Sequence, residues 1–163
     1  MATIDMATLE GSGLHSAADG NNKIYVLENV VNIADAVTLK GTALAAADVI
    51  QALNIPVGAQ VISGGAQVME ATTGTATNVT IDIGVTGGDV DAYVDGFDLD
   101  GAAVLAYAAN GVGTPAIFSA ADTIDILIPT MTGTLLTGKV RVWAVVADVT
   151  SRGSNVGLAA LGS

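Results

Sequence analysis

Short runs of Val, Ile, Thr and Ala, separated by glycine-containing turns, extend along most of this chain. The alternation is clearest in residues 77–85, 122–130 and 139–149, where apolar side chains fall on one face. Alternation with a period of two predicts half-buried β-strands. Aromatic residues make up only 4% of the chain, so Val, Ile, Leu and Ala must fill the core. The pattern predicts an all-β fold, an antiparallel β-sandwich or jelly roll, with about seven or eight strands.

Two other segments are expected to be strands, at residues 23–33 and 59–70. Residues 43–53 are ambiguous between helix and strand, because their alanines favour a helix. The alternation that continues to Ile55, and the Pro-Val-Gly turn after it, favour a strand. We therefore expect a strand from Asp48 to Ile55.

Three details of strand geometry are also predicted. The adjacent Gly64 and Gly65 lie inside a strand pattern, which indicates a bulge or a sharp bend. Pro129 is expected to end the strand that begins at Asp122. Residues 124–128 of that strand and residues 140–146 are expected to pair as an antiparallel hairpin across the intervening loop.

The length of 163 residues fits one domain. Residues 1–22 are small and polar, and we expect an N-terminal arm there, a β-sandwich domain at 23–149 and a C-terminal tail at 150–163. The first basic residue is Lys23, so a secretory signal with a charged start is not expected. The longest apolar run, Ala102–Ala109, is too short for a membrane span, so no membrane partner is expected.

The ionisable composition excludes several function classes. The net charge of −11 and the five scattered Lys and Arg residues argue against a nucleic-acid partner. The chain has no cysteine, and its single histidine, His15, lies in the expected arm without a pocket around it. Phosphate-binding glycine loops and a Gly-x-Ser-x-Gly nucleophile motif are absent from the sequence. We therefore expect that the chain is not an enzyme and holds no cofactor.

One acidic segment is chemically suggestive. It reads GDVDAYVDGFDLDG and contains Asp89, Asp91, Asp95, Asp98 and Asp100. Carboxylates gathered in one loop repel each other, and a structural calcium ion with its many oxygen ligands would relieve that repulsion. The spacing does not fit an EF-hand, however, and turn-forming Asp-Gly pairs explain the composition as well. Calcium and a solvated acidic loop both remain open.

A second candidate site lies in the last strong strand. Lys139, Arg141 and Trp143 alternate along it and share one face. Trp143 is expected to be a core or interface anchor, with the two cations paired to acids such as Asp125 or Asp148. The other interpretation is a ligand platform on which the indole stacks a sugar or an arginine.

The strands and turns of residues 48–149 resemble a group of virion structural proteins of tailed phages. The stretches that carry the resemblance are 49–59 (VIQALNIPVGA), 91–96 (DAYVDG), 113–115 (GTP), 118–125 (FSAADTID) and 139–149 (KVRVWAVVADV). The small β-rich members of this group resemble head decoration, or cement, proteins.

This resemblance implies a protein made in the host cytoplasm that binds the major capsid protein on the outer surface of the capsid. It also implies a homo-oligomer, with a trimer favoured, that stabilises the head by the surface it buries. The alternative from another class is a β-sandwich module that binds carbohydrate or a host surface, in which calcium at the acidic segment assists.

Overall fold

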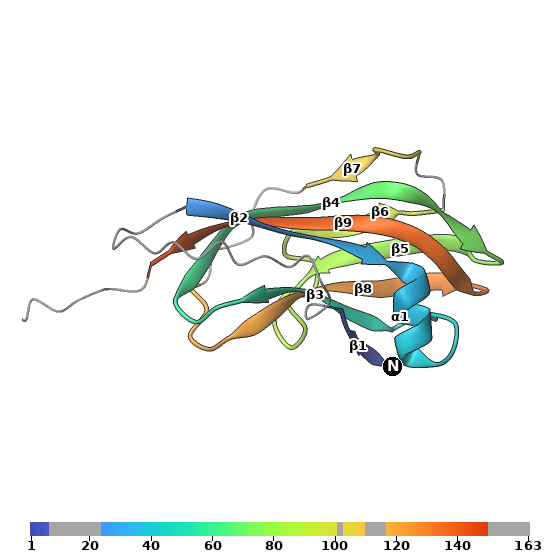
Figure 1. Ribbon diagram of the computed structural model, residues 1–163, viewed down its shortest axis with the longest axis horizontal. Coiled ribbons are helices and arrows are strands. Elements are labelled where there is room, and N and C mark those ends of the chain that lie inside the picture. Colours follow the sequence, from blue (N-terminus) through green and yellow to red (C-terminus); the bar gives the residue numbers. More distant parts are fainter. Residues whose placement is uncertain (7–23, 101–102, 110–116, 150–163) are drawn as a thin grey trace, which may run out of the picture.

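The computed structural model describes residues 1–6, 24–100, 103–109 and 117–149, and these form two packed sheets (Figure 1). The first sheet has five strands in the described residues, in the order β1 (Thr3–Asp5), β3 (Val49–Ile55), β8 (Asp122–Thr132), β5 (Thr77–Gly84) and β6 (Val94–Asp98). The second has four, in the order β2 (Ile24–Asn32), β9 (Leu135–Asp148), β4 (Ala59–Gly74) and β7 (Tyr107–Ala108).

The predicted all-β sandwich is confirmed. Neighbouring strands pair antiparallel, except for β1, which runs parallel to β3. The strand expected from Asp48 to Ile55 is present as β3, which settles residues 49–55 as strand. The described part of the chain contains no helix of the length and apolar character needed to cross a bilayer.

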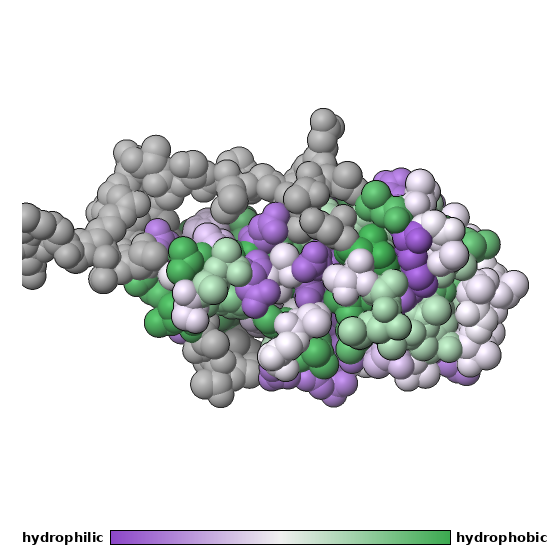
Figure 2. Space-filling view, turned by 90° about the horizontal axis from the view of Figure 1, so that it is seen from below, coloured by the Kyte–Doolittle hydropathy of each residue, from purple (hydrophilic) through white to green (hydrophobic). Residues whose placement is uncertain are grey.

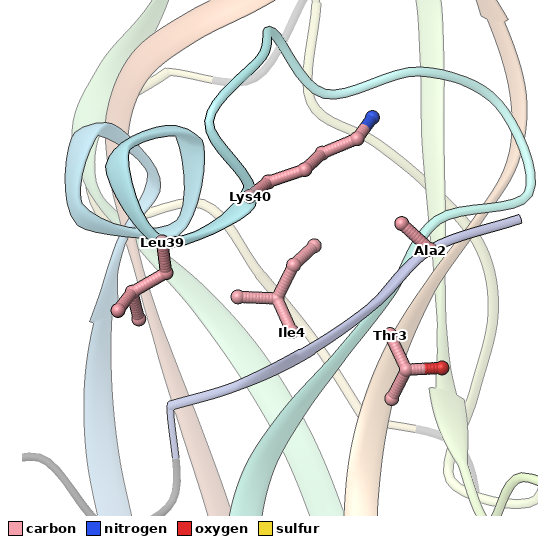
Figure 3. A pocket seen from close by; sticks show the side chains of 5 residues that line it. All are labelled: Ala2, Thr3, Ile4, Leu39 and Lys40. Atoms are coloured by element: carbon pink, nitrogen blue, oxygen red, sulfur yellow. The ribbon is translucent and has the colours of Figure 1, made fainter.

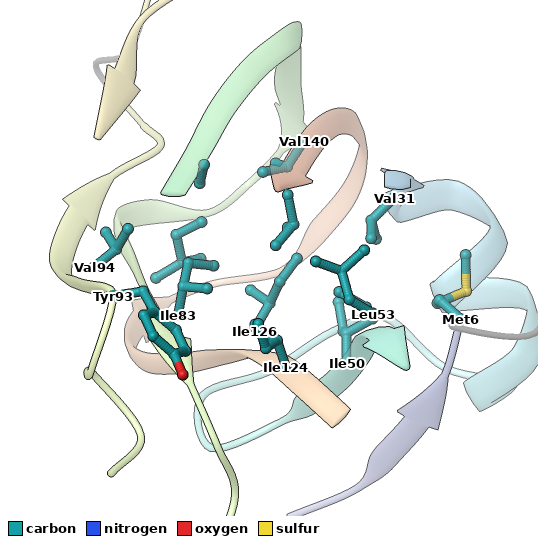
Figure 4. Close-up of a cluster of buried hydrophobic side chains, with 14 of the residues drawn as sticks. Met6, Val31, Ile50, Leu53, Ile83, Tyr93, Val94, Ile124, Ile126 and Val140 are labelled. Carbon is teal, nitrogen blue, oxygen red and sulfur yellow. The ribbon is translucent and has the colours of Figure 1, made fainter. Parts of the chain in front are cut away.

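Small aliphatic side chains fill the space between the sheets, as the composition requires. Side chains from both sheets point toward one another in this cluster (Figure 4). Two of its rows are alternating residues of one strand each: Ile124, Ile126 and Ile128 of β8, and Val140, Val142, Ala144 and Val146 of β9. Burying such aliphatic side chains contributes about 1.5–3 kcal/mol each, so these rows determine which face of each strand points inward.

The prediction of a hairpin between residues 124–128 and 140–146 is wrong. The strand β8 pairs with β3 and β5 in one sheet, whereas β9 pairs with β2 and β4 in the other. The chain changes sheets at Gly133, whose φ of +87° is left-handed. The two strands therefore contribute to opposite walls of the core instead of hydrogen bonding to each other.

The expected bend at Gly64 and Gly65 is also misplaced. The register shifts of β4 lie on either side, between Val61 and Ser63 and between Val68 and Glu70. The two glycines instead make room for aromatic rings. A Cβ on Gly64 would lie 3.0 Å from Cγ of Tyr93, the ring that fills the core at this point.

The strand that begins at Asp122 does not end at Pro129, because β8 continues to Thr132. The pairing with β3 reaches only as far as Leu127, opposite Val49. A proline lacks the backbone N–H, and the pairing on that side has ended where Pro129 lies. The proline therefore costs no ladder hydrogen bond with β3.

One helix, α1 (Ile33–Lys40), was not predicted, since residues 23–33 were expected to end as a strand. The Asn32 side chain caps it by accepting a hydrogen bond from the N–H of Ala34 at 3.1 Å, and Gly41 ends it with a φ of +78°. The helix buries Ile33 and Ala36 against the sandwich and lies beside β1 (Figure 1).

The start of the chain belongs to the sandwich, which differs from the arm expected at residues 1–22. The three residues of β1 pair with β3, and the side chains of Ile4 and Met6 are buried in the core. Residues 7–23 lie outside the described residues, as does the expected tail at 150–163.

Candidate interaction surface

The outer face of the β2-β9-β4-β7 sheet carries the residues that the sequence singled out. Lys139, Arg141, Trp143 and Val145 alternate along β9 with four fully buried residues, so their side chains point away from the core. All four are half-buried, because the neighbouring strands β2 and β4 flank them. The prediction that Lys139, Arg141 and Trp143 share one face is confirmed. The face is not the core of the sandwich.

The indole of Trp143 is held against the sheet by a glycine. Gly65 of β4 is the register partner of Trp143, and a Cβ at Gly65 would lie only 2.7 Å from indole Cζ2. The carbonyl oxygen of Ala108 in β7 would be equally close to that Cβ. The missing side chain at residue 65 therefore allows the ring to lie over the neighbouring strand, which is the reason that Trp143 is half-buried outside the core.

The two cations of this face are paired, but not with the acids expected. Arg141 forms an ion pair with Glu28 of β2, and Lys139 pairs with Glu70 of β4 at 2.8 Å. Both glutamates are cross-strand neighbours, so their side chains lie on the same face. The hydrogen bond with Glu70 raises the pKa of Lys139 above its usual value. Exposed pairs of this kind contribute little to stability, but they neutralise the charge of the face.

The alternatives Asp125 and Asp148 lie elsewhere. Asp125 is buried in β8 of the other sheet, where one carboxylate oxygen accepts a hydrogen bond from the N–H of Thr86 at 3.2 Å. Asp148 ends β9 itself, beyond the cations. The alternation of the sequence identified the shared face, but it contained no information about which strands would flank β9.

Apolar side chains surround these charges. Val26 and Val30 of β2 alternate with Glu28, and their exposed fractions are 51% and 47%. Val26 is the register partner of Val145, so the two valines lie side by side next to Trp143. Tyr107 of β7 is 74% exposed at the far edge of the same sheet.

The arrangement is therefore a sheet face on which a tryptophan and several valines lie beside two neutralised charge pairs. On a chain with a net charge of −11, such a face is suited to contact another protein. Patches with aromatic and aliphatic residues at the centre and paired charges around them are typical of protein interfaces. For comparison, the view from the β1 side shows apolar side chains interspersed with polar ones (Figure 2).

The acidic segment lies on the opposite sheet, at its β6 edge, and is only partly a loop. Asp95 and Asp98 belong to β6. The neighbouring carboxyl group of Asp91 raises the pKa of Asp89 above its usual value. The carboxylate of Asp98 accepts a hydrogen bond from the N–H of Asp100 at 2.9 Å.

The carboxylate of Asp100 in turn accepts a bond from the N–H of Asn78 at 3.4 Å. Nowhere in the described residues do three or more His, Cys, Asp or Glu side chains form a group that could hold a metal ion. The calcium site therefore stays a prediction.

Sequence reasoning missed a buried acid beside this segment. Asp82 of β5 is 7% exposed, and its Oδ1 accepts a hydrogen bond from the N–H of Gly96 at 2.8 Å. Burial raises the pKa of Asp82; the bond from Gly96 opposes this, and the nearby charges of Asp95 and Asp91 raise it further. The alternation of residues 77–85 had placed this side chain on a solvated face.

The described surface includes hollows of modest size. One, of about 390 Å³, lies between β1 and α1, and another, of about 130 Å³, is lined by Tyr25, Pro56, Val57, Ala59 and Asp148. Neither brings two carboxylates together. His15 lies outside the described residues.

Comparison of the fold with solved structures finds chains of two phage capsids. A chain of the capsid asymmetric unit of cyanophage Pam1 matches with a TM-score of 0.53 and 20% identity, covering 87% of this chain and 99% of that chain. A chain of the capsid of Ralstonia phage GP4 matches with a TM-score of 0.60 and 14% identity, covering 94% of this chain and 100% of that chain. No protein-family model and no curated protein matches the sequence.

The structural neighbours are thus phage capsid chains, the class of protein that the sequence resembled. Identities this low establish a shared fold and nothing finer. Each match covers nearly all of the phage chain and most of this chain, so the three chains are of similar length. The likeness therefore extends over the entire sandwich and is not confined to one motif.

Proposed function

We propose that this chain is a capsid decoration, or cement, protein of a tailed phage. It binds the outer surface of the shell formed by the major capsid protein and stabilises the head, and it catalyses no reaction. Its place is the outside of the virion, after synthesis in the host cytoplasm. The single observation that carries the proposal is the apolar, charge-neutral face centred on Trp143, in a fold shared with chains of two phage capsids.

The two structural neighbours support a virion structural role. Both come from capsids, and in both the match spans a complete chain of similar length. A small sandwich that accounts for a whole capsid chain is suited to an accessory component, which adds to a shell instead of enclosing its contents. The decoration role itself is the step that we propose beyond the shared fold.

The outer face of the β2-β9-β4-β7 sheet supports binding to a shell. Trp143 offers a large, rigid side chain whose position is fixed by Gly65, so little conformational entropy is lost on binding. Val26 and Val145 extend the apolar area beside it. Many copies on one closed shell would turn a modest contact into a strong assembly through effective concentration.

We also propose that the chain is a homo-oligomer, with a trimer favoured. The charge of −11 opposes close approach of copies over most of the surface. Copies are therefore expected to associate weakly at low salt and more strongly as salt screens the repulsion. Sedimentation at two salt concentrations measures this directly.

The test of the proposed function uses shells that lack this chain. Purified expanded shells are heated with and without added protein, and the temperature at which they release their contents is recorded. We expect added protein to bind and to raise that temperature, and Trp143→Ala to lose most of the effect. Shells that neither bind the protein nor gain heat resistance would overturn the proposal.

The alternative, a carbohydrate- or host-surface-binding module of the virion, is tested separately. A glycan array probed with and without a calcium chelator would reveal it. A specific glycan signal that disappears with chelator would favour the alternative. The absence of any signal, together with a melting temperature that calcium does not change, would remove it.

A further inference from the structure

The strand β1 is joined to the rest of the molecule by main-chain bonds and two buried side chains. Just before β1, the carbonyl of Ala2 accepts a hydrogen bond from the N–H of Val49 at 2.9 Å. Just after it, the N–H of Met6 donates a hydrogen bond to the carbonyl of Gln51 at 3.0 Å. Ile4 and Met6 are buried, at 4% and 2% exposure. Residues 1–6 therefore fill a slot at the edge of the five-stranded sheet, next to β3.

The polar groups of that slot are held in place without β1. The Asp48 carboxylate forms an ion pair with Lys40 and accepts a bond from the N–H of Ala45 at 2.8 Å. Its other oxygen accepts the N–H of Ala2 at 3.0 Å. The slot therefore presents a fixed acceptor at one end, ready for the start of a strand.

The other end of the slot is equally preformed. The Asn29 side chain of β2 donates to the carbonyl of Ala52 at 3.0 Å, which fixes its orientation within the sandwich. The same amide nitrogen donates to the carbonyl of Met6 at 3.2 Å. A receptor that is ordered before its strand arrives loses little entropy when the strand binds.

The packing beside β1 is open. The hollow of about 390 Å³ between β1 and α1 is lined by Ala2, Thr3, Ile4, Leu39 and Lys40 (Figure 3). The side chain of Leu39 is 56% exposed there. The helix therefore leaves a hollow along one side of β1.

The connection to β2 is much longer than the geometry requires. Asn29 contacts Met6, and Ile24 precedes Asn29 by five residues of the same strand, about 17 Å. The segment 7–23 that joins Met6 to β2 can extend to more than about 50 Å. Such a tether lets β1 reach the slot of a second copy.

We propose that β1 is an exchangeable strand, and that residues 1–6 of one copy occupy the slot beside β3 of a second copy. This goes beyond the proposed shell binding and holds whether or not the shell is the partner. The donating copy supplies Ile4 and Met6 to the core of the second copy, so each sandwich is completed by its neighbour. A connection of this length gives the chain's own strand an effective concentration on the order of 1 mM, so copies compete for the slot near that concentration.

The test uses single cysteines, because the natural chain has none. The parallel register places Asp5 opposite Gln51. Chains carrying only Asp5→Cys are mixed with chains carrying only Gln51→Cys, unfolded, refolded together at about 1 mM and oxidised. We expect disulfide-linked pairs of unlike chains, in a fraction that falls strongly when the refolding is done at micromolar concentration.

The control uses Thr73 of β4 and Thr137 of β9, register partners inside the sandwich. Mixed chains carrying only Thr73→Cys or only Thr137→Cys are expected to remain unlinked. The proposal is overturned if chains become linked in both mixtures, because linkage would then reflect random collision. It is also overturned if the mixture of Asp5→Cys and Gln51→Cys chains stays unlinked, while a single chain carrying both substitutions forms the disulfide within itself. Failure of that double variant to link at all would also overturn it.

Discussion

Trp143 lies over Gly65, its register partner on the neighbouring strand, and occupies the space that a side chain at residue 65 would need. A Cβ there would come within 2.7 Å of indole Cζ2 and within 2.7 Å of the Ala108 carbonyl oxygen. The position of the main apolar side chain on the outer face thus depends on a missing side chain one strand away.

Gly65→Ala is expected to move the indole into solvent. Overpacking at such a contact costs about 1–3 kcal/mol in free energy of unfolding. Because Trp143 is the single tryptophan, its fluorescence maximum reports the change directly and should shift to longer wavelength. Gly88→Ala is the matched control, since its new Cβ would meet nothing closer than 3.6 Å; equal shifts in both variants would contradict this account of Gly65.

Trp143→Ala is expected to weaken shell binding by at least about tenfold, because buried tryptophans at interfaces contribute about 2 kcal/mol or more. Trp143→Phe should retain part of the affinity, as it keeps an aromatic ring. Titration of shells with labelled protein measures both. Thr130→Ala, at an exposed position of the other sheet, serves as the control; an equal loss of affinity there would rule out a special role for the Trp143 face.

The ion pair between Lys40 and Asp48 makes the free energy of unfolding depend on pH in the acidic range. Burial raises the pKa of Asp48, but the bonds from Lys40, Ala45 and Ala2 outweigh it, and the pKa lies below its usual value. A carboxyl whose folded pKa is depressed stabilises the fold above the unfolded pKa of about 4, and this contribution is lost as pH falls through the folded pKa.

Lys40→Met is expected to cost about 3 kcal/mol near neutral pH, because it leaves a buried carboxylate without its cation. Urea unfolding from pH 7 to pH 2 should show the wild-type advantage shrinking as Asp48 is protonated. A difference between the two proteins that is constant over this range would show that the ion pair is not its cause.

The pKa of Asp82 is shifted in the opposite direction, so its effect on stability has the opposite dependence on pH. Its folded pKa is raised, so folding favours the protonated form, and the chain loses stability as pH rises from the unfolded pKa through the folded one. Asp82→Asn keeps an oxygen to accept the bond from Gly96 and removes the buried charge. We expect the variant to be more stable than wild type at pH 7, with the gain disappearing near pH 3; a variant less stable at pH 7 would contradict this assignment.

Much of the fold could be predicted because burial on one face leaves a period of two in the sequence. The alternation of Ile124, Ile126 and Ile128 identified β8 and its inward face, and the alternation around Trp143 identified β9 and its two faces, but not which of those two faces is buried. Alternation indicates the two faces of a strand, but not which strand lies alongside. Because the neighbouring strands could not be predicted, the hairpin between β8 and β9 was wrong, and so were the acidic partners expected for Arg141 and Lys139.

Other features gave weaker signals. The helix α1 has an Asn32 cap and a terminating Gly41, but it follows a strand-like run directly, and the two patterns overlap at Ile33. The strand β1 has only three residues and no alternation to detect. Gly64 and Gly65 were correctly identified as special, yet only the structure shows that they accommodate Tyr93 and Trp143.

The central claim is that the outer face of the β2-β9-β4-β7 sheet binds the shell. The most direct measurement places a cysteine at Val26 on that face, or at Thr130 on the other sheet, and follows its reaction with maleimide. We expect Val26→Cys to react in free protein and to be strongly protected on the shell, while Thr130→Cys reacts equally in both states. Shell-bound protein in which Val26→Cys stays fully reactive would contradict the claim.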